Sequence, residues 1–364
     1  MALNTPQKVL ATTLMLITLS FSTIPFARAL SSSISSEKIS AIGLITYPHM
    51  GMRSGINYLS NGNSYSDLSD TELDTDFAFF AAHNVTTICA RLTWGSVDTD
   101  ETPGPPYSDA AVNNIKRLLA KAEAHGLTVL LTVFHTHFQT NAGAYWHPSY
   151  VGAGNLQSIF TNEAWQTAYV DAVQWVIRQL QSSSSYHIIE GILTLNEPFW
   201  GSTSRRTECE TFIQDLYNAV KAVDARMPCS VRFACPTSPW SSSTPSSAYF
   251  NINNLRNYLD FYAINQYTDF VTGESRYSGH TVARFQNFLN SANADGKQKW
   301  VTEWGVDIPY KTVEGQRAWY EHDIEYFNSQ GIYTSLAWAW QSEGSEAFNI
   351  ATGHATAQPA FYEL

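Results

Sequence analysis

Short apolar runs alternate with longer amphipathic runs along most of the chain from residue 55 onward. The apolar runs have strand length, and the amphipathic runs between them have helical periodicity. Several of the apolar runs contain so few polar positions that both faces of the strand should be buried, as in a parallel sheet. We expect eight strands, at 55–59, 86–93, 127–134, 189–196, 230–234, 261–267, 299–303 and 333–340.

Helices are predicted between these strands. Ser69-x-x-Glu72 is a capping box, which opens a helix through Ala82. Loops that lead from a helix into the next strand are short, whereas several that lead from a strand into the next helix are long. A fold with its function at one face gives this asymmetry. Further helices are expected from 108 to a stop at Gly126, and at about 162–180, 208–223, 281–292 and 313–328, with a weak one near Asn253.

Eight alternating units predict a single-domain α/β fold, most simply a closed (β/α)8 TIM barrel. An open, doubly wound sheet is the main alternative. That fold normally has a glycine-rich phosphate-binding turn after its first strand, and this sequence lacks one there. Residues 39–47 compete with 55–59 as the first strand, or add a strand at the barrel floor.

The N-terminus reads as a targeting segment. Lys8 precedes an apolar stretch from Val9 to Phe26, and the A-x-A sequence Ala27-Arg28-Ala29 follows. This pattern predicts a signal peptide at 1–29, a flexible serine-rich stub at 30–38 and a catalytic domain at 39–364. We therefore expect a secreted protein; an uncleaved anchor is the alternative.

The composition argues against some classes of binding partner. The net charge of −11 argues against nucleic acid and anionic membrane surfaces as partners. No later segment is long and apolar enough to cross a bilayer, so we expect no stable membrane association. We expect a monomer that needs no cofactor. Asn84-Val85-Thr86 is a glycosylation sequon, which matters only if the host glycosylates exported proteins.

The four cysteines are too few for a disulfide scaffold and do not have metal-site spacing. Cys229 and Cys235 bracket the fifth strand, too far apart to bridge. Cys209 and Cys235 should both lie at the upper face of the barrel, on neighbouring units. We predict a Cys209–Cys235 disulfide, with Cys89 as a buried free thiol.

Two of the predicted strands end in a glutamate. Leu193-Thr-Leu-Asn196-Glu197-Pro198 closes the fourth strand, and Trp300-Val-Thr-Glu303-Trp304-Gly305 closes the seventh. Those two strand ends face each other across a barrel, close enough for carboxyl groups about 5–5.5 Å apart. Glycoside hydrolysis with retention uses such a pair. Two unrelated surface carboxylates are the simpler alternative.

These two motifs resemble the glycoside hydrolase clan A barrels, most closely family 5, the cellulase and mannanase family. The resemblance covers roughly residues 55–340. It implies that Glu197 is the general acid/base and Glu303 the nucleophile. Asn196 would then hydrogen-bond the 2-hydroxyl of the sugar.

Four further positions take roles from the same resemblance. Arg91, in the second strand, would hold the nucleophile ionised, since an adjacent cation lowers a carboxylate pKa. His135 would bind substrate, and Tyr267 would hydrogen-bond the nucleophile. Trp340 would form the aromatic floor under the sugar, with Trp338 as a competitor for that role. The family usually has His two residues before the tyrosine, where this chain has Asn265.

The resemblance implies a retaining glycoside hydrolase that cleaves β-glycosidic bonds in a polysaccharide or oligosaccharide. Endo-action on a β-1,4-glucan or a mannan is favoured. An exo-acting β-glucosidase or β-1,3-glucanase and a transglycosylase are alternatives on the same fold, and a non-catalytic carbohydrate-binding barrel is an alternative of another class. His135-Thr136-His137 has the spacing of two metal ligands on one strand, but we find no matching set elsewhere and expect no metal.

Overall fold

The structure is a computed structural model that describes residues 52–58, 65–135, 147–152, 156–198, 205–240, 250–308, 310–340, 348, 350–353 and 356–364. All of these belong to one compact unit, residues 40–364. The predicted signal peptide (1–29), the stub (30–38) and the candidate strand at 39–47 lie outside the described residues.

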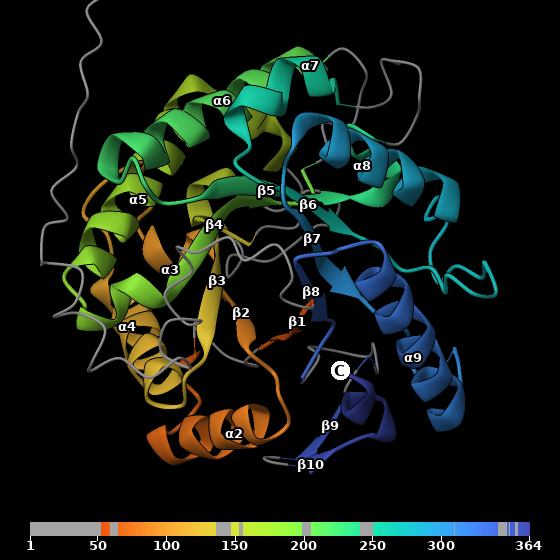
Figure 1. The fold of residues 1–364 in the computed structure, drawn as a ribbon. Helices are drawn as coiled ribbons and strands as arrows, with labels where there is room; N and C mark the ends of the chain where they lie inside the picture. Colours follow the sequence, from red (N-terminus) through yellow and green to blue (C-terminus); the bar gives the residue numbers. More distant parts are fainter. Residues whose placement is uncertain are drawn as a thin grey trace, which may run out of the picture. The chain divides into compact units, whose positions relative to one another are not determined.

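Eight parallel strands close into a barrel in chain order, β1 to β8, as predicted (Figure 1). The first strand starts two residues earlier than expected, and the eighth is shorter than its apolar run suggested. The strands are β1 (Arg53–Asn57), β2 (Thr87–Leu92), β3 (Thr128–Val133), β4 (Ile189–Asn196), β5 (Cys229–Ala234), β6 (Tyr262–Asn265), β7 (Lys299–Trp304) and β8 (Thr334–Ala337), and a small antiparallel pair, β9 (Ala351–Gly353) and β10 (Thr356–Ala357), follows them.

Helices surround the barrel and begin at the residues that can cap them. Ser69 and Glu72 form the predicted capping box at the start of the first long helix. Asn162, Thr281 and Thr312 cap later helices in the same way, each accepting a backbone N–H in the first turn. The helices are α2 (Asp70–Ala82), α3 (Trp94–Val97), α4 (Asp109–Ala124), α5 (Glu163–Gln181), α6 (Arg206–Val223), α7 (Ile252–Leu255), α8 (Val282–Asp295) and α9 (Val313–Ser329), with 3₁₀ helices at Ser149–Val151, Leu156–Phe160, Ser184–Ile188, Cys235–Thr237, Arg256–Tyr258 and Pro359–Glu363.

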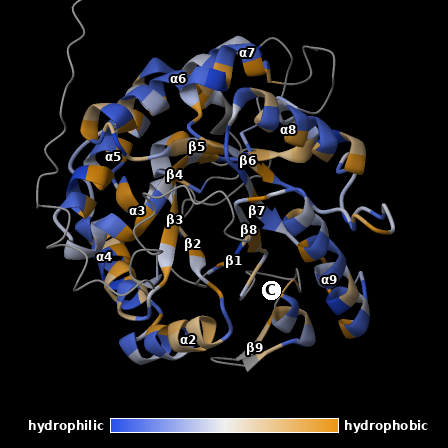
Figure 2. Ribbon diagram, viewed as in Figure 1, coloured by the Kyte–Doolittle hydropathy of each residue, from blue (hydrophilic) through white to orange (hydrophobic). Residues whose placement is uncertain are grey.

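The main core lies between the strands and the helices. Outward-facing strand residues such as Ile88, Val129 and Val301 pack there against the apolar sides of the helices. The helices carry both hydrophobic and hydrophilic residues along their length (Figure 2), as expected for helices with one face on a sheet and one in solvent. None of the described helices is long and apolar enough to cross a membrane.

A second, smaller apolar cluster fills the inside of the barrel. It consists of seven residues that lie in, or directly before, six of the strands: Cys89, Leu130, Leu193, Phe261, Ala263, Trp300 and Leu336. Below it, Arg53 of β1 forms an ion pair with Glu190 of β4 and donates to Thr128. This filled interior supports the polar side chains that gather above it at the carboxyl ends of the strands, the face on which such barrels carry chemistry.

The predicted Cys209–Cys235 disulfide is not formed, because all four cysteines are free and buried. Cys209 faces the core from the first turn of α6. Cys235, by contrast, lies next to the backbone of Thr281 and the side chain of Arg284, at the start of α8. The two side chains therefore lie beside different helices, although the strands that precede them, β4 and β5, are neighbours in the barrel. Cys89 is a buried free thiol, as predicted.

Candidate active site

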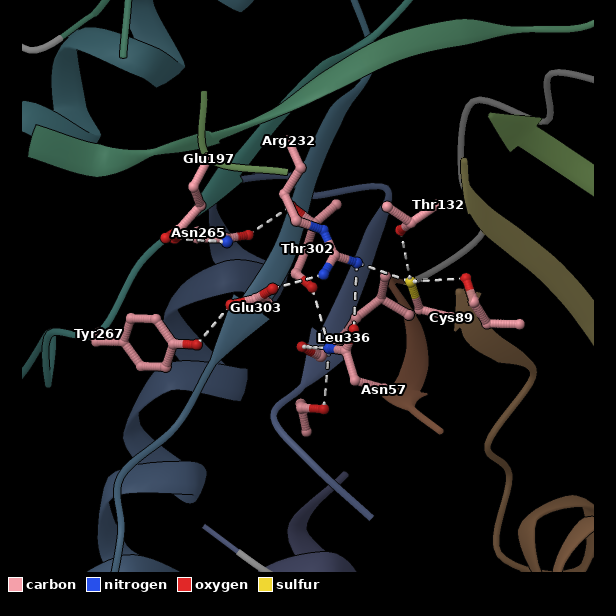
Figure 3. Close-up of polar contacts among 12 residues, drawn as sticks. Asn57, Cys89, Thr132, Glu197, Arg232, Asn265, Tyr267, Thr302, Glu303 and Leu336 are labelled. Atoms are coloured by element: carbon pink, nitrogen blue, oxygen red, sulfur yellow. Dashed lines mark hydrogen bonds and ion pairs between the residues drawn. The ribbon is translucent and has the colours of Figure 1, made fainter. Parts of the chain in front are cut away.

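The strands deliver both predicted catalytic carboxylates to the same end of the barrel (Figure 3). Glu303 is the fifth residue of β7, and its side chain is almost fully buried. Glu197 follows the last residue of β4 directly. The charge of Glu303 influences the protonation of Glu197, so the two groups act on one another electrostatically.

Shifts in the register of strand pairing determine the directions of the two glutamate side chains. The pairing of β4 with β5 shifts register between Leu193 and Asn196, and that of β7 with β8 shifts between Val301 and Trp304. An extra residue in one strand rotates the following side chains relative to the regular alternation. Each glutamate therefore comes from a locally distorted strand end, as is common beside active sites.

The backbone of Glu197 is in the left-handed region, with φ of 44°. This conformation costs a residue with a Cβ roughly 1–2 kcal/mol. Its N–H donates to the carbonyl oxygen of Arg232 at 2.7 Å, which ties the end of β4 to β5. This hydrogen bond holds the strand tip, and with it the carboxylate, in place despite the strain.

Two side chains hold the carboxylate of Glu303. Arg232 of β5 donates from Nη1 to Oε1 at 2.5 Å. The hydroxyl of Tyr267, just after β6, donates to Oε2 at 2.7 Å. The contact between Tyr267 and Glu303 is the one that the sequence analysis assigned to this tyrosine. Both carboxylate oxygens thus accept a hydrogen bond, which fixes the orientation of the group.

Glu197 has a different environment. Asn265 of β6 donates from Nδ2 to Oε1 of Glu197 at 2.8 Å. The orientation of that amide is set by Thr302, whose hydroxyl donates to Oδ1 of Asn265 at 2.9 Å. An amide therefore occupies the position where a histidine was expected, and it serves the acid/base candidate with a donor that does not titrate.

These environments separate the two carboxyl groups. Burial, together with the negative charge of Glu303, raises the pKa of Glu197 to about 7, although Asn265 and Arg232 oppose the shift. Glu303 has the buried guanidinium as a direct partner, whereas Glu197 has only a neutral one. With a pKa of about 7, Glu197 can carry a proton near neutral pH, as a general acid must.

Three other predicted substrate-binding residues also lie at this end of the barrel. Arg91 is in β2 on the same side of the strand as Cys89, which faces the barrel interior, and it is buried. His135 follows β3 and Asn196 ends β4, and both are buried. The described contact of a guanidinium with Glu303 comes from Arg232, so the role proposed for Arg91 stays a prediction.

Trp340 does not lie where the sequence analysis placed it. Its indole is fully buried and packs against Phe79 and Phe80 of α2 and against Phe361 near the C-terminus. This is the core outside the barrel, because the chain has already left β8 and turned outward. Trp340 is therefore a packing residue and not a floor for a sugar.

Trp338 is the aromatic residue at the end of β8 that faces the site. Its ring is nearly parallel to that of His135, with centroids 6.3 Å apart and an interplanar angle of 13°. The hydroxyl of Tyr320 donates to its carbonyl oxygen at 3.2 Å. Tyr320 can approach because Gly305 has no Cβ, since a Cβ there would lie 2.5 Å from that hydroxyl. The competitor named from sequence is thus the better floor candidate.

Mutation of Trp340 should lower mainly stability, and mutation of Trp338 should lower mainly activity. Trp340→Ala should lower the free energy of unfolding by about 3–5 kcal/mol through loss of core packing. Trp338→Ala should leave unfolding much less affected and lower kcat/KM by up to about tenfold, the value of one stacking contact. Chemical denaturation and steady-state kinetics of both variants check this, and equal loss of stability in the two would contradict it.

Arg232 is the main residue of the site that the sequence analysis missed. It is a single cation in an otherwise apolar strand, Cys229-Ser-Val-Arg232-Phe-Ala234. Arg91 is likewise a cation in an apolar strand, and such a cation needs a buried partner. Applied evenly, that argument would have flagged both residues.

The family follows from comparison with known proteins. The family model described as cellulase (glycosyl hydrolase family 5) matches residues 53–344. The chain belongs to glycosyl hydrolase family 5. It is therefore a glycosyl hydrolase, and the resemblance drawn from Glu197 and Glu303 is confirmed at the level of the family. No curated protein sequence matches this chain.

Solved structures of this fold are similar at low sequence identity. A point variant of GH5_18 from Streptomyces cattleya, in complex with Manb1-4GlcNAc, superimposes with a TM-score of 0.65 at 12% identity, covering 86% of this chain and 79% of that one. The hyperthermostable endo-1,4-beta-D-mannanase from Thermotoga petrophila RKU-1 gives 0.63 at 15% identity, with 86% and 99% covered. The exo-beta-1,4-mannosidase Op5Man5 from Opitutaceae bacterium strain TAV5 gives 0.66 at 13%, with 86% and 58% covered.

Of the two histidines in His135-Thr136-His137, His137 lies outside the described residues. Within the part of the chain that the structure describes, no group of three His, Cys, Asp or Glu side chains has the arrangement of a metal site.

Proposed function

We propose that this protein is a secreted retaining β-glycosidase that cleaves β-1,4-linked mannosyl substrates. The observation that carries the reaction type is the carboxyl pair with unequal partners: Glu303 held by Arg232 and Tyr267, and Glu197 held by neutral Asn265. The substrate class is supported by similar structures that include an endo-mannanase, an exo-mannosidase and a protein in complex with Manb1-4GlcNAc. β-1,4-glucan is the second candidate.

The first step forms a covalent intermediate. A carboxylate oxygen of Glu303 attacks the anomeric carbon while the bond from that carbon to the glycosidic oxygen breaks. Glu197 gives its proton to the departing oxygen, so the leaving group departs as an alcohol. A pKa of about 7 for Glu197, raised by burial and by Glu303, keeps that proton available in neutral and mildly acidic solution.

The second step releases the sugar. Glu197, now ionised, takes a proton from a water molecule whose oxygen attacks the anomeric carbon. The bond to Glu303 breaks, and its carboxylate regains its negative charge. Two inversions at one carbon leave the product with the configuration of the substrate.

A panel of substrates tests the proposal. The purified protein is incubated with mannan, manno-oligosaccharides, β-1,4-glucan, xylan and aryl β-glycosides, and the anomer released first is identified by NMR. We expect the highest kcat/KM on β-1,4-mannosyl substrates, with β-anomers as the first product. A preference for β-1,4-glucan would make glucan the substrate instead of mannan. Release of α-anomers first would contradict retention. No hydrolysis of any β-glycoside would contradict the proposed function.

Secretion rests on the pattern of Lys8, the apolar run 9–26 and the Ala27-Arg28-Ala29 site. We propose that the chain is exported and cut after Ala29. Intact mass of the protein from the culture medium of its host would support this if it corresponds to a chain that begins at Leu30, and a full-length cell-associated form would favour the anchor.

A further inference from the structure

A buried amide lies between Thr302 and Glu197 at the carboxyl ends of β6 and β7. Asn265, the last residue of β6, and Thr302 of β7 are both fully buried. The hydroxyl of Thr302 lies 2.9 Å from Oδ1 of Asn265, and Nδ2 of Asn265 lies 2.8 Å from Oε1 of Glu197. Figure 3 shows the amide between the two side chains. The hydrogen bonds thus form a chain that ends on the acid/base candidate.

The direction of this chain follows from the donors and acceptors available. A buried hydroxyl needs an acceptor for its proton, and Oδ1 of Asn265 is the acceptor shown for Thr302. With the amide turned around, Nδ2 would face the hydroxyl oxygen, and the hydroxyl proton would lose its acceptor. The amide oxygen would then face Glu197, which offers only acceptors when it is ionised. The orientation that suits Thr302 is therefore the one that suits Glu197 in both of its protonation states.

Strand pairing fixes the positions of Asn265 and Thr302. The N–H of Gln266, the residue after Asn265, donates to the carbonyl oxygen of Glu303 at 2.8 Å. The carbonyl oxygen of Thr302 accepts from Nδ2 of Asn57 in β1 at 3.0 Å. The amide therefore presents its N–H at a fixed place, and the carboxyl group that accepts this hydrogen bond takes its position from the barrel.

The hydrogen bond makes the two oxygens of Glu197 unequal. A neutral carboxyl group has a carbonyl oxygen that accepts well and a hydroxyl oxygen that carries the proton. Because the N–H of Asn265 lies on Oε1, the proton is favoured on Oε2. Oε2 is then the atom that can give its proton to the glycosidic oxygen and later take one from water.

We propose that Thr302 and Asn265 are positioning residues that act in series: Thr302 fixes the amide, and the amide keeps a donor on Oε1 of Glu197, so that Oε2 exchanges the proton in both steps. We call this pair of residues the Thr302–Asn265 relay. The inference rests on the proposed function and adds to it the atom through which the acid/base works. Thr302 acts on Glu197 only through Asn265.

The relay affects the two protonation states of Glu197 differently. A hydrogen bond from an N–H to an ionised carboxylate is stronger than one to a neutral carboxyl group. The contact with Asn265 therefore opposes the increase in the pKa of Glu197 that burial and the charge of Glu303 cause. It helps the proton leave in the first step and stabilises the ionised base in the second. Loss of this donor should raise the pKa of Glu197 in the free enzyme and in the glycosyl-enzyme alike.

A purely structural role for the amide is the competing explanation. A buried Asn side chain needs partners at both ends whatever it does for the reaction. Removal of the hydroxyl of Thr302 would then lower stability and nothing else. The two explanations differ in whether the protonation of Glu197 changes in a variant that remains folded.

The first test compares Thr302→Val, which loses the hydroxyl, with Thr302→Ser, which keeps it. In Thr302→Val we expect the basic limb of kcat/KM to move upward by about one unit, the difference between a hydrogen bond to a charged group and one to a neutral group. On dinitrophenyl glycosides, where a burst shows that the second step limits turnover, the acidic limb of kcat should also move upward. Thr302→Ser should have both limbs at their wild-type pH.

A double-mutant cycle tests whether the two residues act in series. Asn265→Leu should move both limbs at least as far as Thr302→Val does, and adding Thr302→Val to Asn265→Leu should move them no further. Thr334→Val is the matched control, because it removes a buried hydroxyl from the first residue of β8, which pairs with Arg53 at the opposite end of the barrel. It should leave both limbs unchanged.

A second readout needs no turnover. With carbon-13 in the carboxyl groups of the glutamates, an NMR titration gives the pKa of Glu197, whose signal is assigned by its absence in Glu197→Gln. We expect a midpoint of about 7 in the wild type and a higher midpoint in folded Thr302→Val and Asn265→Leu. Thr302→Ala replaces Thr302→Val if the latter does not fold.

An unchanged midpoint in the folded variant without the hydroxyl of Thr302 would overturn the inference. So would a full additional shift when Thr302→Val is introduced into Asn265→Leu, because Thr302 would then act by another route. Absence of all hydrolysis by the wild type would overturn the proposed function, while the titration would still decide whether the Thr302–Asn265 relay sets the protonation of Glu197.

Discussion

Glu303→Gln should reduce kcat/KM for β-glycoside hydrolysis by about 10⁴-fold or more, because an amide cannot form the ester with the anomeric carbon. The fold should survive, since Gln keeps the shape of the side chain and can still accept the hydrogen bond from Tyr267 that the carboxylate accepts at 2.7 Å. Steady-state kinetics and the thermal unfolding curve of the same preparation are the measurements.

A smaller variant separates the nucleophile from other roles of the same residue. Glu303→Ala leaves space at the anomeric carbon, which added azide can fill. Azide should attack that carbon in place of the carboxylate, restore the release of a good leaving group, and give a glycosyl azide of inverted configuration. Full activity in Glu303→Gln, or no effect of azide on a folded Glu303→Ala, would count against the assignment. Glu190→Gln, at the opposite end of the barrel, is the control carboxylate.

Glu197→Gln should cost about 10²–10⁴-fold in kcat on substrates with an alkyl sugar leaving group, the value of one positioned general acid. On dinitrophenyl glycosides the first step should be nearly unaffected, because that leaving group needs no proton. The second step still needs a base, so the glycosyl-enzyme should accumulate and give a burst of dinitrophenol. Rapid-mixing kinetics on the two substrate classes make the comparison.

The pH dependence follows from the same group. Burial and the charge of Glu303 raise the pKa of Glu197 to about 7. The general acid is present below that pH and is lost above it, so kcat/KM of the wild type should fall as the pH rises through about 7. The basic limb should be absent in Glu197→Gln. If the limb persists in that variant, another group supplies the proton.

Asn265 was noticed in the sequence, but its contact with Glu197 is seen only in the structure. From sequence it was only a departure from the expected histidine. In the structure its amide is oriented by Thr302 and donates to Glu197. The contact could not be derived beforehand, because it depends on the register of β6 against β7, which itself shifts at this residue.

The two tryptophans and two of the cysteines show more clearly which side-chain positions could not be predicted from the sequence. Trp338 and Trp340 have the same spacing that would put both on one face of a regular strand, yet one lies at the site and the other in the outer core. Strand β8 ends at Ala337, so alternation no longer holds beyond it. Cys209 and Cys235 were placed by their strand order, but side-chain direction, not order, decides whether a bridge can form.

The sequence by itself determined the strand and helix order, the closed barrel and the two glutamates at strand ends, because hydrophobic periodicity and local capping are properties of neighbouring residues. Only the tertiary structure decided that Arg232 lies under Glu303, that Asn57 and Cys89 orient it, and that Glu197 has a neutral partner. These contacts join residues more than sixty positions apart on different strands. Their existence depends on barrel closure and on bulges that turn single side chains, which no local pattern encodes.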